Sequence, residues 1–300
     1  MQTSKRIAWI GCGVMGSSMV GHLMQAGHLV TIHTRTKERA RPLLERGAAW
    51  AETPREAADG QDVVVSMVGL PCDVEEVHLG KHGTLRASTP APLLIDMTSS
   101  LPSLARSIQD AANECAVATL DAPVTGGDIG ARNATLSILV GGRTATFEQA
   151  LPLFRLLGKT IVHHGGAGSG QQAKLVNQIM IASTMVGLCE ALIFARASGL
   201  DGSKLLESLS AGAASSWSLT NLAPRIFNRE FDPGFFIDHF VKDLAMAVEE
   251  GRACGLELPG LRQAERLYSL AKSGQLGDRG THGLYLLYER GGVVGGSPSA

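Results

Sequence analysis

The sequence contains a glycine pattern of the kind that brings backbone close to phosphate groups. Residues 6–10 form an apolar run, and residues 11–16 follow as Gly-Cys-Gly-Val-Met-Gly before a helix-like stretch. In such a unit the first glycine permits a tight turn, the second lets backbone approach a pyrophosphate, and the third lets the helix pack on the strand. The helix N-terminus then faces the phosphates. The pattern predicts a dinucleotide site made of Gly11, Gly13, Val14, Met15 and Gly16.

The end of the second predicted strand is basic. Residues 29–33, Leu-Val-Thr-Ile-His, form a mostly apolar strand pattern, and Thr34-Arg35-Thr36-Lys37 follow them. An acidic residue at this place would bind the ribose 2′-hydroxyl of NAD, whereas a basic one suits the 2′-phosphate of NADP. Arg35, Thr36 and Lys37 therefore predict NADP in preference to NAD, with NAD still possible. In the alternative interpretation, Arg35 and Lys37 are solvated charges at the start of a helix.

A lysine, Lys174, stands at the start of a long apolar segment, residues 175–195. Burial lowers the pKa of a lysine, so such a group can give a proton to a reacting carbonyl or take one from a hydroxyl. Asn177 and Gln178 share its helix face at i+3 and i+4 and could orient the lysine or a substrate hydroxyl. Alternatively, the lysine reaches solvent and the amides bind neighbouring backbone.

A turn at Thr125, Gly126 and Gly127 follows a predicted strand and offers a hydroxyl and consecutive backbone N–H groups. This geometry suits a carboxylate, although an ordinary tight turn has the same composition. Lys242 and Asp243 could form a surface ion pair of small consequence. Adjacent residues on a helix point in different directions, which argues against a shared role. The histidines at 163 and 164 lack a carboxylate or cysteine at metal-ligand spacing, so no metal site is predicted.

Composition is that of an ordinary soluble globular protein. Of the 300 residues, 44% are hydrophobic and 18% charged, with a net charge of -1, which gives no reason to expect nucleic acid or a membrane surface as a partner. The five cysteines are widely spaced without a Cys-x-x-Cys pair, which favours a reducing compartment over a disulfide framework. The first residues do not resemble a signal peptide, so we expect a cytoplasmic protein.

Alternating strand and helix patterns predict an α/β protein with two domains. Residues 1–166 form an NADP-binding, Rossmann-type domain with a doubly wound, mostly parallel sheet. Residues 167–300 form an all-helical substrate and oligomerisation domain, joined by a long interdomain helix and ending in a loose tail at 291–300. Strands are expected at 6–10, 29–33, 63–67, 93–96, 118–121, 136–140 and 160–163, and helices at 170–198, 203–210, 218–227, 236–254, 259–273 and 281–289.

The apolar segment 175–195 is almost long enough to span a bilayer. It contains amide, hydroxyl and carboxyl side chains, which favour a buried helix at a domain or subunit interface. A homodimer or homotetramer is therefore expected, although burial within one chain would also satisfy the pattern.

Four motifs in order resemble those of the β-hydroxyacid dehydrogenase family, which includes 3-hydroxyisobutyrate dehydrogenase, tartronate semialdehyde reductase and glyoxylate/succinic semialdehyde reductase. The similarity covers nearly the whole chain. The motifs are Gly11-Cys12-Gly13-Val14-Met15-Gly16, Asp121-Ala122-Pro123-Val124-Thr125-Gly126-Gly127, Gly168-Ser169-Gly170-Gln171-Gln172-Ala173-Lys174 and Lys242-Asp243-Leu244.

This resemblance implies a role for each motif. Lys174 would be the catalytic lysine, and Thr125, Gly126 and Gly127 would hold the substrate carboxylate. Phe235 and Asp243 would line the substrate pocket, while Leu70, Pro71, Ser99 and Lys242 would lie against the cofactor. The chain departs from the family in having threonine at 125, where many members have serine, and glutamine at 178, where asparagine is frequent. The supporting amide is thus either Asn177 or Gln178.

The function expected from these features is hydride transfer between NADP(H) and a small carboxylic acid, as hydroxy acid or semialdehyde, with Lys174 handling the proton. The resemblance leaves the substrate open among 3-hydroxyisobutyrate, 2-hydroxy-3-oxopropionate and glyoxylate or succinic semialdehyde. Two alternatives remain, an NADPH-dependent imine reductase and a non-catalytic NADP-binding protein.

Overall fold

The computed structural model describes residues 4–291 of the chain. The described residues form two compact units that divide between Lys174 and Leu175, within the long helix. The domain boundary expected at 166/167 stays a prediction. The predicted loose tail, apart from Gly291, lies outside the described residues.

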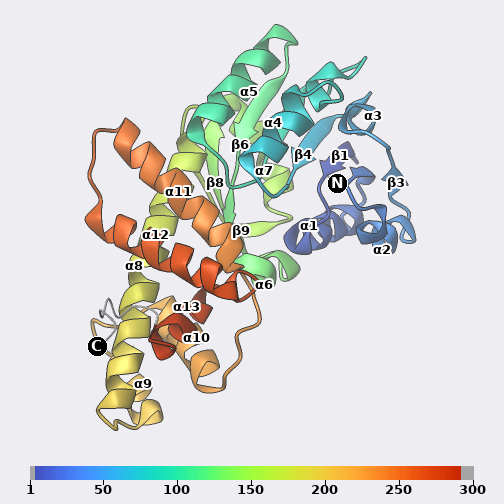
Figure 1. Ribbon diagram of the computed structural model, residues 1–300. Coiled ribbons are helices and arrows are strands. Elements are labelled where there is room, and N and C mark those ends of the chain that lie inside the picture. Colours follow the sequence, from blue (N-terminus) through green and yellow to red (C-terminus); the bar gives the residue numbers. More distant parts are fainter. Residues whose placement is uncertain (1–3, 292–300) are drawn as a thin grey trace. The chain divides into compact units, whose positions relative to one another are not determined.

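The first unit is built on one twisted sheet with helices on both faces (Figure 1). Its strands are β1 (Arg6–Ile10), β2 (Leu29–His33), β3 (Ala49–Trp50), β4 (Val63–Ser66), β5 (Leu93–Asp96), β6 (Ala118–Asp121), β7 (Val124–Thr125), β8 (Leu136–Gly142) and β9 (Gly158–Gly165). Its helices are α1 (Val14–Gln25), α2 (Arg41–Leu44), α3 (Pro54–Ala58), α4 (Pro71–Leu79), α5 (Pro102–Glu114), α6 (Gly127–Arg132) and α7 (Thr144–Phe154), with short 3-10 turns at Lys37–Arg39 and Thr84–Arg86.

The sheet has the order β3-β2-β1-β4-β5-β6-β8-β7, and β9 pairs with β8. Strands β1 to β6 run parallel, whereas β8 is antiparallel to β6 and β7. The predicted mostly parallel, doubly wound fold is thereby confirmed. All seven predicted strands are present, and β3 and β7, of two residues each, escaped prediction because so short a segment has no periodicity.

The central strands are buried on both faces, as parallel strands between two helix layers must be. Ile7 and Trp9 of β1 belong to the core under α1, α2, α6 and α7. Ala8 and Ile10 of the same strand belong to the core under α3, α4 and α5. Alternate residues therefore serve opposite layers, which explains why these strands read as continuous apolar runs.

The last residues of five parallel strands stand in one row across the sheet. Ile10 lies opposite His33 on one side and Ser66 on the other, Ser66 lies opposite Asp96, and Asp96 lies opposite Asp121. Every loop that leaves these carboxyl ends therefore starts from the same edge. Ligands in open α/β sheets bind at this edge.

A buried polar chain joins the ends of β4 and β5. The Ser66 hydroxyl donates to Asp96 Oδ1 at 2.7 Å and lies 2.9 Å from His78 Nε2, and His78 Nδ1 lies 2.8 Å from Thr84 Oγ1. Burial lowers the pKa of His78 to about 3, so the ring is neutral. Burial also raises the pKa of Asp96 to about 6, against the hydrogen bonds from Ser66 and Thr98, which lower it.

The second unit is helical. It contains most of α8 (Ser169–Ala197), followed by α9 (Gly202–Ser210), α10 (Trp217–Phe227), α11 (Ile237–Ala253), α12 (Pro259–Ala271), a π turn at Lys272–Leu276, a 3-10 turn at Thr281–Gly283 and α13 (Leu284–Glu289). The six predicted helices are present, with the last one divided into the 3-10 turn and α13. Gly199 ends α8 with φ +71, as a C-terminal glycine does.

Helix α8 has one buried face and one exposed apolar face. Met185, Cys189 and Leu192 are buried, whereas Val176 is 62%, Met180 64% and Phe194 70% exposed. By length and composition α8 could cross a membrane, and 39% of its apolar window is buried. The expectation of a buried helix therefore holds for one face, and the homo-oligomer expected from this segment stays a prediction.

The start of α8 lies against the ends of β6 and β8, because glycines remove the side chains that would separate them. A Cβ on Gly170 would overlap the carbonyl oxygen of Leu139 and lie 2.5 Å from that of Asp121. A Cβ on Gly141 would lie 2.6 Å from the Gly170 amide nitrogen. Gly168 has φ +88, a conformation that other residues rarely adopt.

Gly170→Ala should destabilise the protein by about 2 kcal/mol or more, because the added methyl group meets backbone that has no room to move. Gly187→Ala, further along the same helix, is the matched control, since a Cβ there meets nothing within 4 Å. This control should gain up to about 1 kcal/mol from helix propensity. Denaturant unfolding of both variants measures the difference, and equal stabilities would contradict the close packing of the Gly170 backbone.

Asp96→Asn should flatten the pH dependence of stability between about pH 4 and 6. The pKa of Asp96 is higher in the folded chain than in the unfolded one, so stability is lost as pH rises through this interval. The amide removes the ionisation and keeps an acceptor for Ser66. The Tm of the variant minus that of the wild type should therefore increase with pH, whereas Asp110→Asn on α5 should show a constant difference. A constant difference for Asp96→Asn as well would contradict the assignment.

Candidate functional site

The glycine turn after β1 has the conformation that the sequence predicts. Gly11 has φ +102, donates its N–H to the His33 carbonyl at 2.8 Å, and has no room for a Cβ beside Met67. A Cβ on Gly16 would overlap the Gly11 carbonyl, so this glycine brings helix and strand together. A Cβ on Gly13 would meet nothing within 4 Å, which leaves its backbone open to approach.

The N-terminus of α1 fits the pyrophosphate of a dinucleotide. Gly13 is the N-cap, no side chain of the described residues caps the helix, and its first turn has no acidic residue. Val14 is 65% exposed, and Met15 packs against the core. The N–H groups of this turn and the positive end of the helix dipole are therefore available to an anion.

The two basic residues after β2 contact different side chains, Arg35 that of Asp73 and Lys37 that of Trp50. Arg35 pairs with Asp73 Oδ1 at 3.0 Å and keeps 81% of its side chain exposed. Thr36 is the N-cap of the turn that begins at Lys37. Lys37 lies over the ring of Trp50 at 4.8 Å. The Arg35 side chain is therefore the more accessible of the two to a ligand.

Asp73 connects two of the loops assigned to the cofactor. Its Oδ2 accepts the Leu70 N–H at 3.0 Å, while its Oδ1 binds Arg35. Leu70 is the N-cap of α4, and Pro71 is the first residue of that helix. Sequence reasoning missed Asp73, and its signal was an acidic residue at the third position of a helix that begins with proline.

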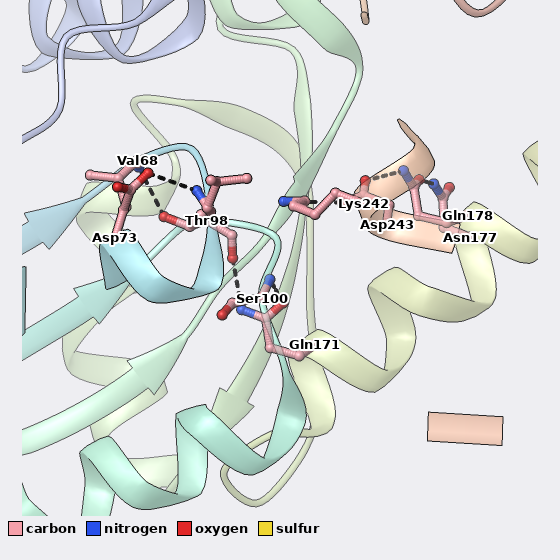
Figure 2. A network of polar contacts seen from close by, with 10 residues as sticks. Val68, Asp73, Thr98, Ser100, Gln171, Asn177, Gln178, Lys242 and Asp243 are labelled. Carbon is pink, nitrogen blue, oxygen red and sulfur yellow. Dashed lines mark hydrogen bonds and ion pairs between the residues drawn. The ribbon is translucent and has the colours of Figure 1, made fainter. Parts of the chain in front are cut away.

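The loop after β5 is held at several points. The Thr98 N–H donates to Asp96 Oδ1 at 3.1 Å. Thr98 Oγ1 accepts the Val68 N–H at 3.0 Å (Figure 2). Ser100 donates its N–H to Gln171 Oε1 at 2.9 Å. Ser99, which the resemblance assigns to the cofactor, lies between these fixed residues. The loops after β4 and β5 are thus bonded to each other.

Lys174 lies in the second turn of α8, whose start is bonded to the end of β6. Asp121 accepts the N–H groups of Gly168 at 2.8 Å and Gln171 at 2.9 Å. Lys174 is 6% exposed, so the interpretation in which it reaches solvent is wrong. A buried ammonium is stable only where polar or charged groups compensate for its desolvation.

The Thr125–Gly127 turn follows Asp121 by way of Ala122 and Pro123. Thr125 closes β7 opposite Ser137 of β8, and Gly126 and Gly127 have φ +126 and +63. This backbone requires glycine at 126 and favours it at 127. Asp128 in the next turn is neutralised by Arg132 at 2.9 Å. The turn therefore starts from the sheet edge that also supplies the cofactor loops.

The second unit holds a buried polar network of its own. Gln178 Nε2 donates to Asp243 Oδ2 at 2.5 Å, Asn177 Nδ2 donates to Gln178 Oε1 at 2.8 Å, and Lys242 Nζ lies 3.1 Å from Asp243 Oδ1 (Figure 2). The side chains of Lys242 and Asp243 are 15% and 2% exposed. The interpretation as a surface ion pair is therefore wrong, and the amides bind each other and a carboxylate instead of neighbouring backbone.

The remaining predicted residues have structural neighbours. Phe235, which precedes α11, packs edge-on against Phe240 with ring centroids 5.7 Å apart. His163 stacks on Phe147 and lies 2.7 Å from the Gly142 carbonyl. Within residues 4–291, no cluster of three or more His, Cys, Asp or Glu side chains could hold a metal ion.

The comparisons with known proteins agree with this arrangement. Residues 6–166 match the family model described as the NAD binding domain of 6-phosphogluconate dehydrogenase. Residues 168–288 match the one described as NAD-binding of NADP-dependent 3-hydroxyisobutyrate dehydrogenase.

Individual relatives extend over nearly the whole chain. A probable 3-hydroxyisobutyrate dehydrogenase-like protein of Arabidopsis thaliana is 48% identical, over 96% of this chain and 86% of its own. The 2-hydroxy-3-oxopropionate reductase of Escherichia coli is 39% identical, over 88% and 90%. A solved 3-hydroxyisobutyrate dehydrogenase from Mycobacterium tuberculosis, with L-serine, superposes with a TM-score of 0.88 at 29% identity, over 95% and 99%.

An imine reductase from Myxococcus stipitatus shares the fold at a TM-score of 0.63 and 20% identity, over 94% and 99% of the two chains. This likeness is weaker than those to the hydroxy-acid enzymes and extends to the fold alone. The chain therefore belongs to the β-hydroxyacid dehydrogenase family, and it is an NAD(P)-dependent oxidoreductase that acts on CH–OH groups.

Proposed function

We propose that this enzyme uses NADP(H) to interconvert a small carboxylate-bearing semialdehyde and its hydroxy acid. The observation that carries the proposal is the buried Lys174, on a helix whose first turn is bonded to Asp121 at the edge where the glycine turn also begins. A proton-handling group, an anion-binding helix end and a carboxylate-sized turn thus start from one sheet edge.

When bound at the glycine turn, the reduced cofactor would supply the hydride for the carbonyl carbon of the substrate. The Lys174 ammonium then gives its proton to the oxygen that is becoming an alkoxide. The Thr125 hydroxyl and the Gly126 and Gly127 backbone hold the carboxylate of the substrate and so fix which carbon is presented. In the oxidative direction neutral Lys174 takes the hydroxyl proton.

A short substrate within this class is supported by the E. coli and M. tuberculosis relatives, whose names specify short acids with a carbonyl or hydroxyl near the carboxylate. Glyoxylate, succinic semialdehyde and 2-hydroxy-3-oxopropionate are the first compounds to assay. Threonine at 125 adds a methyl group beside the carboxylate turn, which favours the shorter compounds.

A preference for NADP over NAD is supported by Arg35. Its side chain is 81% exposed, and its guanidinium pairs with Asp73. Arg35 follows the end of β2, which is where the 2′-phosphate of NADP binds in folds of this type. Lys37 contributes less to this preference, because Trp50 and Glu52 of the β3 edge engage its ammonium.

Lys174→Ala should lower kcat for semialdehyde reduction by about 10³-fold, because general acid catalysis contributes on this order. NADPH affinity, measured by fluorescence titration, should stay within threefold of the wild type. The control Lys204→Ala, at an exposed position of α9, should keep full activity. Wild-type turnover in Lys174→Ala would refute the role of Lys174. If the wild-type enzyme reduced imines but no semialdehyde, the imine reductase alternative would be favoured.

Arg35→Ala should lower kcat/KM for NADPH by about 10-fold to 100-fold and leave that for NADH nearly unchanged, because a charged hydrogen bond to phosphate is lost. Arg41→Ala, an exposed arginine paired with Glu45 on α2, is the matched control. Steady-state assays with both cofactors give the ratio. An equal fall in kcat/KM for NADPH and NADH would show that Arg35 does not bind the 2′-phosphate.

A further inference from the structure

The side chain of Gln171 makes two hydrogen bonds to one loop. Its Oε1 accepts the Ser100 N–H at 2.9 Å, and its Nε2 donates to the Thr98 carbonyl at 2.7 Å (Figure 2). Gln171 is 1% exposed. A primary amide is suited to this task, because it offers a donor and an acceptor side by side to two backbone groups of opposite kind.

The loop bonded to Gln171 contains Ser99, which lies between Thr98 and Ser100. Thr98 binds the Asp96 carboxylate through its N–H and the Val68 N–H through its hydroxyl. Gln171 is therefore connected, through Thr98, to the loops after β4 and β5. Both loops carry residues assigned to the cofactor.

Gln171 also stands three residues before Lys174 on α8. Residues at this spacing lie on neighbouring parts of one helix face, so the rotation of the helix at Gln171 sets the direction of the lysine. Asp121 bonds the backbone of the same turn and fixes where the helix begins. The Gln171 side chain fixes how the helix is turned relative to the Ser99 loop.

We propose that Gln171 is a positioning residue for the reaction: its two bonds to Thr98 and Ser100 set the Lys174 ammonium relative to the cofactor loop. This inference rests on the proposed function of Lys174. It assigns to Gln171 no contact with substrate or cofactor. Its effect is therefore on kcat and not on binding, since a displacement of about 1 Å of a catalytic group costs up to about 100-fold in rate.

The test compares Gln171→Met and Gln171→Glu with the same two changes at Gln149, an exposed position on α7. Gln171→Met keeps the length and loses both bonds. We expect kcat for semialdehyde reduction to fall about 30-fold to 100-fold, with KM and NADPH affinity within threefold of the wild type. The Gln149 variants should behave like the wild type.

Gln171→Glu adds a readout that a loss of stability alone would not give. A protonated carboxyl can donate to the Thr98 carbonyl and accept from Ser100, whereas the ionised form cannot donate. Asp121, at the Gln171 backbone, and Asp96, at Thr98, face this position, and Lys174 lies one turn on. Relative to the wild type at each pH, kcat of Gln171→Glu should recover as pH is lowered from 8.5 to 6.

Three outcomes would overturn the inference or its basis. Wild-type kcat in Gln171→Met would overturn the positioning role and leave the function of Lys174 standing. Parallel loss of kcat, NADPH affinity and Tm, with no recovery of Gln171→Glu at low pH, would make Gln171 a residue of stability only. Absence of turnover by the wild-type enzyme across the semialdehyde panel would contradict the proposed function itself.

Discussion

The arrangement of the first unit depends on the carboxylate of Asp121, which accepts the N–H groups of Gly168 and Gln171 at the start of α8. Burial raises the pKa of this carboxyl, while the backbone hydrogen bonds counteract that rise. A helix N-terminus offers unsatisfied N–H groups and a positive dipole, so a buried carboxylate is stable there. The close approach requires glycine at positions 141 and 170, because a Cβ at either would separate helix and sheet, whereas Gly168 is required by its φ of +88.

The consequences of that attachment are chemical. Asp121 is the last residue of β6, and the neighbouring strand ends carry the loops expected to bind the dinucleotide. Because the start of α8 is bonded to Asp121, Lys174 on that helix lies at the same edge of the sheet. Two further carboxylates organise the neighbouring loops. Asp96 holds the loop after β5, and Asp73 ties Arg35 to the start of α4. Acidic side chains thus build a site whose proposed ligands are themselves anions, and they do so while paired with N–H groups and a guanidinium.

Much of the fold was readable from periodicity and punctuation. The helix predicted at 170–198 is α8 at Ser169–Ala197, because a long apolar run between a glycine-rich loop and Gly199 has few other solutions. Strands β3 and β7, which the sequence did not predict, are defined by their hydrogen bonds to β2 and β8, since two residues show no strand pattern of their own. The prediction of a surface ion pair between Lys242 and Asp243 was also wrong. Adjacent positions in the sequence do not show whether two side chains are buried, and both of these side chains are largely buried in the fold.

The sequence by itself determined the order of elements, the glycine turn, the basic residues after β2 and the motif that ends in Lys174, because each is a local pattern whose chemistry depends on spacing along the chain. Only the tertiary structure decided which polar groups satisfy one another. Gln171 to Thr98 and Ser100, Asp73 to Arg35, and Gln178 to Asp243 join residues 38 to 73 positions apart. Such pairs are selected by burial, since each donor and acceptor withdrawn from water must find a partner wherever the fold places one.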